Sequence, residues 1–326
     1  MNAIATDMGD PDGNFVSAFQ SSGFHARVFE LACYAYLVEA GTVVDRSQVR
    51  PDFMVLSAGS TLAVEAVTAN PRAGDSTDVS LRALQDVPLN EMLKKCGDEF
   101  PIRVGSPLFS KLGKRYWELP HCRGQPFVLL IGPFHEAGSQ MYVDENLARY
   151  LYGADRLGDW TDHNGILLRE TPIAEHTFEG KTIPSNFFGQ PGAENVSAIL
   201  YCNQFSVSKF FRMAAQHVGV PTGVSAVVRG ARLLDDGYSV DWFQYSLTDP
   251  AGLNEDWTWG VTLFENPNAL HPLPSGCLQS TSTFHVRDGR LVRDVYGFHS
   301  LTSWMQASVP PVWTLPRTAA PEEPGR

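Results

Sequence analysis

The run Pro126-Phe127-Val128-Leu129-Leu130-Ile131 is the feature of this 326-residue chain that most restricts its fold. A continuously apolar run of this length is typical of a strand that is buried on both faces, as the parallel strands of α/β proteins are. The chain is long enough for one large core with additions or for two modest domains. We therefore expect an α/β fold built around this strand.

The segments that precede this strand give an order of elements. Apolar residues at helical spacing predict a helix from about Ser22 to Glu39, with Gly41 as its stop signal. Short β-prone runs then predict three strands, at residues 42–44, 52–56 and 61–68. The dipeptide Ala58-Gly59 joins the last two strands.

One further helix is expected between these strands and the apolar run. Residues 70–100 are weakly periodic and predict at most a short helix around 89–95. Ser106 offers an N-cap, with Pro107 at the first helical position, and this helix must end near Leu119 because Pro120 follows. The first half of the chain should run helix, three strands, helix, strand.

The second half predicts a strand at 198–202, a helix at 206–217 and a hairpin around Asp288-Gly289. We expect four segments along the chain. They are a flexible lead (1–20), an α/β core with insertions (21–218), a β-rich C-terminal elaboration packed on it (219–308) and a disordered, proline-rich tail (309–326).

Charge and composition limit the partners and the compartment. The formal net charge of -11 argues against indiscriminate coating of nucleic acid, yet basic residues gather in 102–123 and 203–232, either as binding patches or as solvated surface. No stretch approaches 18 consecutive apolar residues, so no membrane partner is expected. The odd, scattered cysteines and the absence of a signal-peptide pattern at the start favour the cytoplasm.

The hairpin around Ala58-Gly59 brings two acids together. If these two residues form the turn, Asp52 lies directly opposite Glu65 on one face, among largely apolar neighbours. Like charges that face each other across a sheet destabilise it unless a cation lies between them, and oxygen ligands favour Mg²⁺. In another register the acids would lie on opposite faces or at the rim.

Arg50-Pro51-Asp52-Phe53, followed thirteen residues after Asp52 by Val64-Glu65-Ala66, resembles the PD-(D/E)xK restriction-endonuclease-like phosphodiesterases. The resemblance covers residues 22–135 and implies an αβββαβ core in which the two acids hold Mg²⁺ or Mn²⁺. A glutamate on the first helix often completes the site in that family, and Glu30 matches its place.

One departure from the family pattern concerns its lysine, because Val67 stands at the usual position, two residues beyond the second acid. Lysines donated from the helix after the three strands are known in the family, and we expect Lys111 to serve. Alternatively, Lys111 is an exposed lysine on the surface of this helix and does not take part in a site. The neighbours Lys114 and Arg115 would orient the phosphate backbone, and Lys209 and Arg212 would extend the groove.

The resulting hypothesis is a metal-dependent nuclease that acts on nucleic acid, with DNA as the expected polymer, in defence or repair. The alternative is a degenerate nuclease fold retained as a binding module for nucleic acid or protein. A hydrolase that acts on another substrate through the region of His135 is a third option. The aromatic residues of the second half, Trp242 among them, either stack on bases or fill a core.

Overall fold

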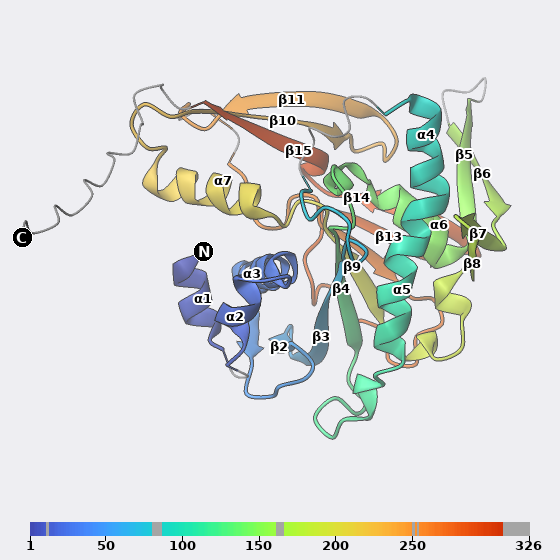
Figure 1. The fold of residues 1–326 in the computed structure, drawn as a ribbon. Coiled ribbons are helices and arrows are strands. Elements are labelled where there is room, and N and C mark those ends of the chain that lie inside the picture. Colours follow the sequence, from blue (N-terminus) through green and yellow to red (C-terminus); the bar gives the residue numbers. More distant parts are fainter. Residues whose placement is uncertain (11–12, 80–86, 161–165, 250–251, 253, 309–326) are drawn as a thin grey trace, which may run out of the picture.

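A mixed eight-stranded sheet runs through the centre of the molecule (Figure 1). The computed structural model describes all residues except 11–12, 80–86, 161–165, 250–251, 253 and 309–326. The strand order is β1-β2-β3-β4-β9-β12-β13-β14. These strands are β1 (Val43–Asp45), β2 (Phe53–Ser57), β3 (Ser60–Ala69), β4 (Phe127–Pro133), β9 (Ala198–Tyr201), β12 (Thr262–Glu265), β13 (Ser282–Arg287) and β14 (Arg290–Val295). An α/β fold is confirmed.

Helices cover both faces of this sheet. Figure 1 shows α1 to α3 on one side and α4 to α6 on the other. The helices are α1 (Asn2–Met8), α2 (Phe15–Phe19), α3 (Phe24–Glu39), α4 (Leu89–Lys94), α5 (Phe100–Leu112), α6 (Asp144–Tyr152) and α7 (Val207–Val218). Within the described residues, no helix combines the length and the apolar character that crossing a membrane requires.

Strand β4 is the centre of both cores, and each of its seven residues is buried. It pairs in parallel with β3 and with β9. Alternate side chains enter opposite cores, so Val128 packs on the α3 side and Leu129 on the α5 side. Gly132 lets α3 approach closely, because a Cβ there would lie 2.4 Å from the Phe29 ring.

The hairpin β2–β3 has the predicted register. Phe53 faces Val64 and Ser57 faces Ser60, which leaves Ala58 and Gly59 as a two-residue loop. Both loop residues have positive φ, 48° and 79°, the geometry of the tight hairpin turns whose twist matches that of the strands. The second predicted hairpin, around Asp288-Gly289, joins β13 to β14 in the same way.

The helix predicted to open at Ser106 begins earlier and ends earlier. A π-helical turn (Lys95–Glu99) joins α4 to α5, which runs from Phe100 through Pro107 to Leu112. A buried face of apolar side chains, from Phe100 to Leu112, holds the helix together across the proline. The extension to Leu119 was wrong, because Arg115 adopts a left-handed conformation and a separate short 3₁₀ turn (Tyr116–Glu118) follows.

The structure adds detail to the expected segments. Within the expected flexible lead (1–20), the described helices α1 and α2 bury Met8 and Phe15 in the core on the α3 side. The boundary expected after residue 218 does not coincide with an edge of the central sheet. Strands β12, β13 and β14, which follow it in the chain, belong to that sheet. The tail predicted at 309–326 lies outside the described residues.

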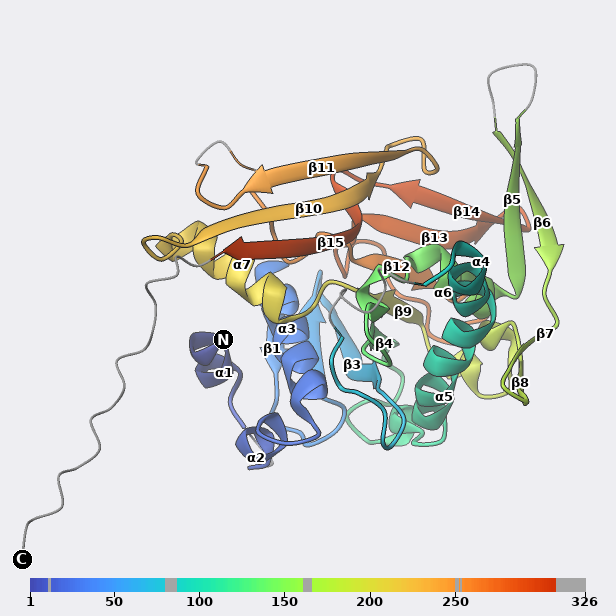
Figure 2. The same ribbon diagram turned by 45° about the horizontal axis from the view of Figure 1, so that its top comes forward.

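Three smaller sheets lie beside the central one, and the largest is made of β10 (Ser225–Leu233), β11 (Val240–Ser246) and β15 (His299–Ser308). Figure 2 shows it as a layer above the central sheet, next to α7. Two-stranded ribbons are formed by β5 (Ala154–Trp160) with β6 (Ile166–Pro172) and by β7 (Glu175–Phe178) with β8 (Lys181–Pro184).

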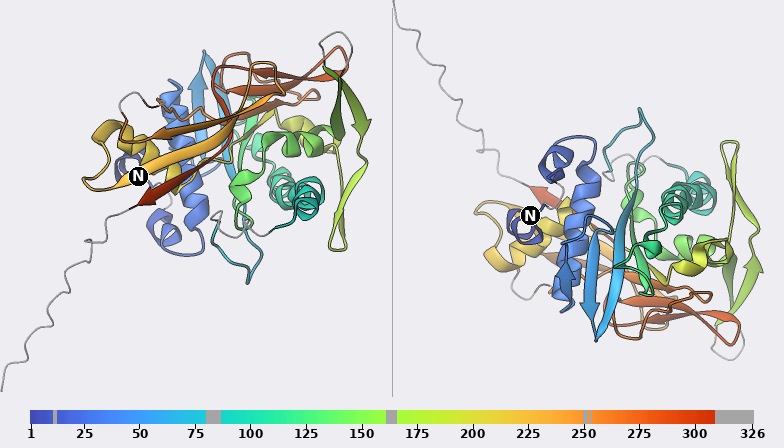
Figure 3. Two further views of the ribbon diagram at one scale, coloured as in Figure 1. Left: turned by 90° about the horizontal axis from the view of Figure 1, so that it is seen from above. Right: turned by 90° about the horizontal axis from the view of Figure 1, so that it is seen from below.

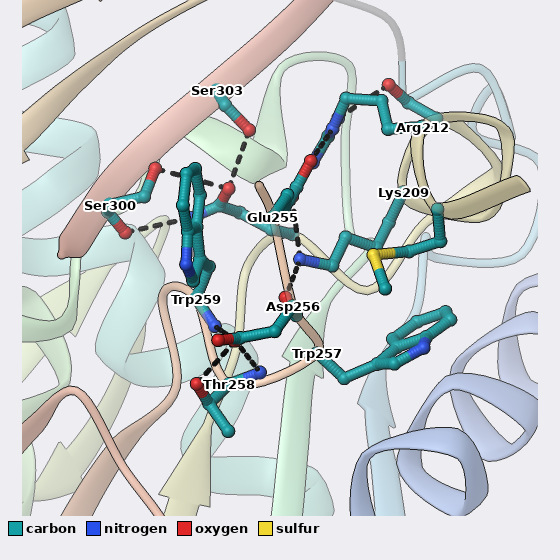
Figure 4. A network of polar contacts seen from close by, with 12 residues as sticks. Lys209, Arg212, Glu255, Asp256, Trp257, Thr258, Trp259, Ser300 and Ser303 are labelled. Atoms are coloured by element: carbon teal, nitrogen blue, oxygen red, sulfur yellow. Dashed lines mark hydrogen bonds and ion pairs between the residues drawn. The ribbon is translucent and has the colours of Figure 1, made fainter. Parts of the chain in front are cut away.

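A buried ion network fastens α7 to this layer (Figure 4). Glu255 accepts hydrogen bonds from Lys209 Nζ at 2.6 Å and from Arg212 Nε at 2.7 Å. Tyr245 of β11 donates to the same carboxylate at 3.0 Å. Burial alone would raise the pKa of Glu255, but Lys209 and Arg212 outweigh it and hold the pKa at about 2. The carboxylate is therefore the shared counterion of two buried cations.

Glu255→Ala should destabilise the fold by about 3–5 kcal/mol, because it leaves two cations buried without their counterion. The free energy of unfolding from urea titration measures this. Glu91→Ala, at an exposed position of α4, is the control and should change stability by less than about 0.5 kcal/mol. Equal losses in the two variants would contradict the role given to the network.

Candidate active site

The β2–β3 register brings Asp52 and Glu65 together, as the sequence predicts. Asp52 immediately precedes β2, and each carboxylate accepts a hydrogen bond from the backbone beside the other acid. The Asp52 amide donates to Glu65 Oε2 at 3.0 Å, and the Ala66 amide donates to Asp52 Oδ2 at 2.8 Å. The two acids thus converge where β2 begins, on the central sheet.

Glu65 points toward α5. It lies between Ala63 and Val67 in β3, and both of these side chains pack in the same core as α5. The Glu65 side chain is only 5% exposed. A carboxylate on this buried face needs a partner from the helix, because burial without compensation is costly.

Lys111 supplies that partner. It lies in the last turn of α5 and its ammonium group donates to Glu65 Oε1. Burial alone would lower the pKa of Lys111, but Glu65 and then Asp52 outweigh it and raise the pKa, so the side chain stays charged. The Tyr116 ring lies 5.9 Å from the same nitrogen. Lys111 therefore contacts Glu65 from the last turn of α5, because this helix begins before Ser106.

Negative charge at Asp52 is only partly compensated. Burial, the neighbouring Glu65 and then Glu30 raise the pKa of the Asp52 carboxyl from 3.8 to about 8. The Ala66 amide and Lys111 act in the opposite direction and are outweighed. These surroundings favour the protonated form of the Asp52 carboxyl as long as no further cation lies beside it.

Glu30 lies close enough to raise the pKa of Asp52, but its oxygens already have partners. Arg27 donates to Oε2 at 2.6 Å and Arg46 donates to Oε1 at 2.7 Å. As a third metal ligand, Glu30 would first have to give up one of these arginines. Sequence reasoning missed both arginines. Arg27 was detectable from its spacing three residues before Glu30 on a helix, whereas nothing in the sequence links Arg46 to it.

Asp52 and Glu65 are compatible with a bound Mg²⁺. Among the described residues, no three histidine, cysteine or acidic side chains form a group that could hold a metal. Mg²⁺ commonly uses only one or two carboxylates and completes its shell with water and substrate phosphate. The raised pKa of Asp52 reflects the lack of a counterion at this carboxyl, so a bound cation would favour release of its proton.

Exposed cations lie just beyond α5. Lys114 and Arg115 are both exposed, and Arg115 also forms an ion pair with Glu118. They follow Lys111 in the chain and point to solvent, where an approaching phosphate could meet them. Their predicted role in nucleic-acid binding stays a prediction.

Lys209 and Arg212 cannot extend a binding groove from their positions in this structure. Their side chains are 0% and 1% exposed, because both turn inward to Glu255 (Figure 4). Two of the four bases in residues 203–232 thus belong to an ion network whose acid lies more than forty residues further along the chain.

His135, the third option, is also internal. It follows β4 and packs against the stacked rings of Phe100 and Tyr142, with centroid distances of 5.9 and 5.0 Å. Burial lowers its pKa to about 3, and neither ring nitrogen has a hydrogen-bond partner among the described residues. Within the described part of the chain, no nucleophile or acid hydrogen-bonds to it as a catalytic base would require.

Comparison with known proteins returned no match, whether to family models, to curated proteins or to solved structures.

The contribution of Asp52 to the free energy of unfolding should fall as the pH rises from about 4 to about 8 in the absence of divalent ions. The folded state keeps the Asp52 proton, whose pKa is raised to about 8, while the unfolded chain has released it. Buried His135, whose pKa is lowered to about 3, acts in the opposite direction below about pH 6.5 in both proteins. Asp52→Asn removes only the Asp52 contribution, so the wild type should lose stability relative to the variant as the pH rises, by at most about 1.4 kcal/mol per pH unit. Urea unfolding across this range tests it, and identical slopes for the two proteins would contradict the assignment.

Proposed function

We propose that the chain is a metal-dependent phosphodiester hydrolase acting on nucleic acid, with DNA as the expected polymer and the cytoplasm as the expected compartment. The observation that carries this proposal is the convergence of Asp52, Glu65 and Lys111 from three different elements. Two acids, of which Glu65 pairs with Lys111 while Asp52 has no cationic partner among the described residues, and one charged lysine are the groups that this chemistry requires.

The order of elements supports the proposal. The helix α3, the strands β1, β2 and β3, the helix α5 and the strand β4 follow one another as in the PD-(D/E)xK core. Strands β1 to β3 form an antiparallel meander, and β4 pairs in parallel with β3. We propose that this part of the sheet is a restriction-endonuclease-like core, and that β9 and β12 to β14 are additions to it.

The roles of the residues follow from their charges and positions. Asp52, once deprotonated, and Glu65 would hold Mg²⁺ or Mn²⁺ by one oxygen each. The bound ion would polarise the scissile phosphate and lower the pKa of a water molecule. Lys111 places its positive charge beside Glu65, where it would offset the negative charge that builds on the phosphate in the transition state. Lys114 and Arg115 would orient the backbone phosphates.

A second candidate function is a nucleic-acid or protein binding module that has lost catalysis. The observation that favours it is that Glu65 and Glu30 already have cationic partners, so the site is nearly neutral without a metal. In that case Lys111 is a structural counterion. The hydrolase requires a divalent ion for cleavage and loses cleavage when Asp52 is substituted, whereas the binding module does not cleave nucleic acid at all.

Purified protein should cleave single-stranded or duplex DNA, or RNA, only when Mg²⁺ or Mn²⁺ is present. Asp52→Asn should abolish cleavage, because it keeps the shape of the side chain and removes the charge that holds the ion. Gel analysis of labelled substrates, with chelator as a control, measures the result. Cleavage that survives both chelator and substitution would refute the mechanism, and absence of any cleavage would favour the binding module.

Lys111→Met should lower the rate of cleavage by about 10² to 10³, as expected for loss of a charge that stabilises the transition state. It should not weaken Mn²⁺ binding in calorimetric titration, because Glu65 loses its neutralising partner. Lys114→Met is the matched control, since it removes an exposed lysine three residues away and should have a much smaller effect. Equal effects of the two substitutions would remove Lys111 from the catalytic machinery.

A further inference from the structure

The outer face of the sheet formed by β10, β11 and β15 carries two tryptophans that the proposed active site does not use. The left view in Figure 3 looks onto this sheet from above. Trp242 is 69% exposed, which is unusual for so large an apolar side chain. Its ring contacts that of Trp304 edge-to-face, with centroids 6.5 Å apart. The cross-strand partner of Trp242 on the central strand β10 is Ala231. Because its side chain is small, it leaves space over β10 in which the two rings meet.

Arg229 lies next to this aromatic pair on the central strand, with Trp304 and Gln244 as its cross-strand partners. Gln244 accepts from Arg229 Nε at 2.7 Å, and Gln306 accepts from Nη1 at 2.9 Å. No carboxylate pairs with Arg229 within the described structure. Two neutral amides therefore hold the guanidinium in place and leave its charge available to an anion.

The opposite face of the same sheet is fixed to the rest of the molecule. Tyr245 donates to Glu255 in the buried ion network, and Ser303 donates to Gln204 at 2.6 Å. Gly230 leaves room for the Phe243 ring, which a Cβ would meet at 2.4 Å. The outer face is thus the surface of a rigid sheet and is not covered by any described segment at Trp242.

We infer that this face, defined by Trp242, Trp304 and Arg229, binds single-stranded nucleic acid. The exposed ring of Trp242, with the half-buried ring of Trp304 beside it, can stack with an unpaired base, and the neighbouring Arg229 can meet the phosphate backbone. Duplex bases are already stacked on one another and cannot lie on such a face. The inference goes beyond the proposed hydrolase, because binding here requires neither the acid pair nor a divalent ion.

Fluorescence anisotropy with a labelled oligothymidylate, in chelator, tests this inference on the full chain. Trp242→Ala should weaken binding about tenfold, the size of one lost stacking contact. Trp242→Phe keeps a ring and should retain most of the affinity. Arg229→Gln should weaken binding and reduce the salt dependence by about one phosphate contact. Phe109→Ala, at an exposed aromatic of α5 that is 57% exposed, is the matched control and should bind as the wild type does.

The design separates this face from the active site. Asp52→Asn should bind the oligonucleotide as tightly as the wild type, so loss of cleavage with normal binding leaves the inference intact. The inference is overturned if the wild type does not bind the oligonucleotide, if Trp242→Ala and Arg229→Gln bind normally, or if duplex DNA binds equally well. Binding of a neutral oligosaccharide in place of the oligonucleotide, lost in Trp242→Ala, would likewise overturn it.

Discussion

The pairing of β4 with β3 on one side and β9 on the other is the constraint on which the rest of the structure depends. Every residue of β4 is buried, so both faces of the sheet must be covered by helices. Because side chains alternate along a strand, the face that carries Glu65 is also the face that α5 covers. The lysine that meets Glu65 therefore has to come from α5, and Lys111 in its last turn does so.

Burial of the acid pair lowers the free energy of unfolding, and the neighbouring cations and backbone amides offset this loss only in part. Glu65 has a lysine and Glu30 has two arginines, while Asp52 has a backbone amide and a raised pKa. The buried network at Glu255 differs, because the carboxylate there bonds directly to two cations and a tyrosine. Every acid of that network has a cationic partner, whereas in the acid pair Asp52 has none among the described residues.

The local parts of the fold could be predicted from the sequence, because short-range geometry fixes them. A two-residue turn at Ala58-Gly59 allows one register, which set Asp52 opposite Glu65, and the helix predicted at 206–217 is present as α7. Prediction from the sequence failed where contacts between residues far apart in the chain determine the local structure. Pro107 lies inside α5 because a buried apolar face outweighs the lost hydrogen bond. The burial of Lys209 and Arg212 depends on Glu255, a partner that no local pattern identifies.

The extension of the central sheet by β12, β13 and β14 sets an order for folding during synthesis. Strand β9 pairs with β4 on one edge and with β12 on the other, yet about sixty residues separate β9 from β12 in the chain. At the usual rates of translation, about 5–20 residues per second, β9 has an unpaired edge for several seconds after it emerges. An unpaired edge of this kind is a template for pairing with other chains. The nascent protein therefore passes through a stage at which its own sheet is open to aggregation, and β12 closes that edge.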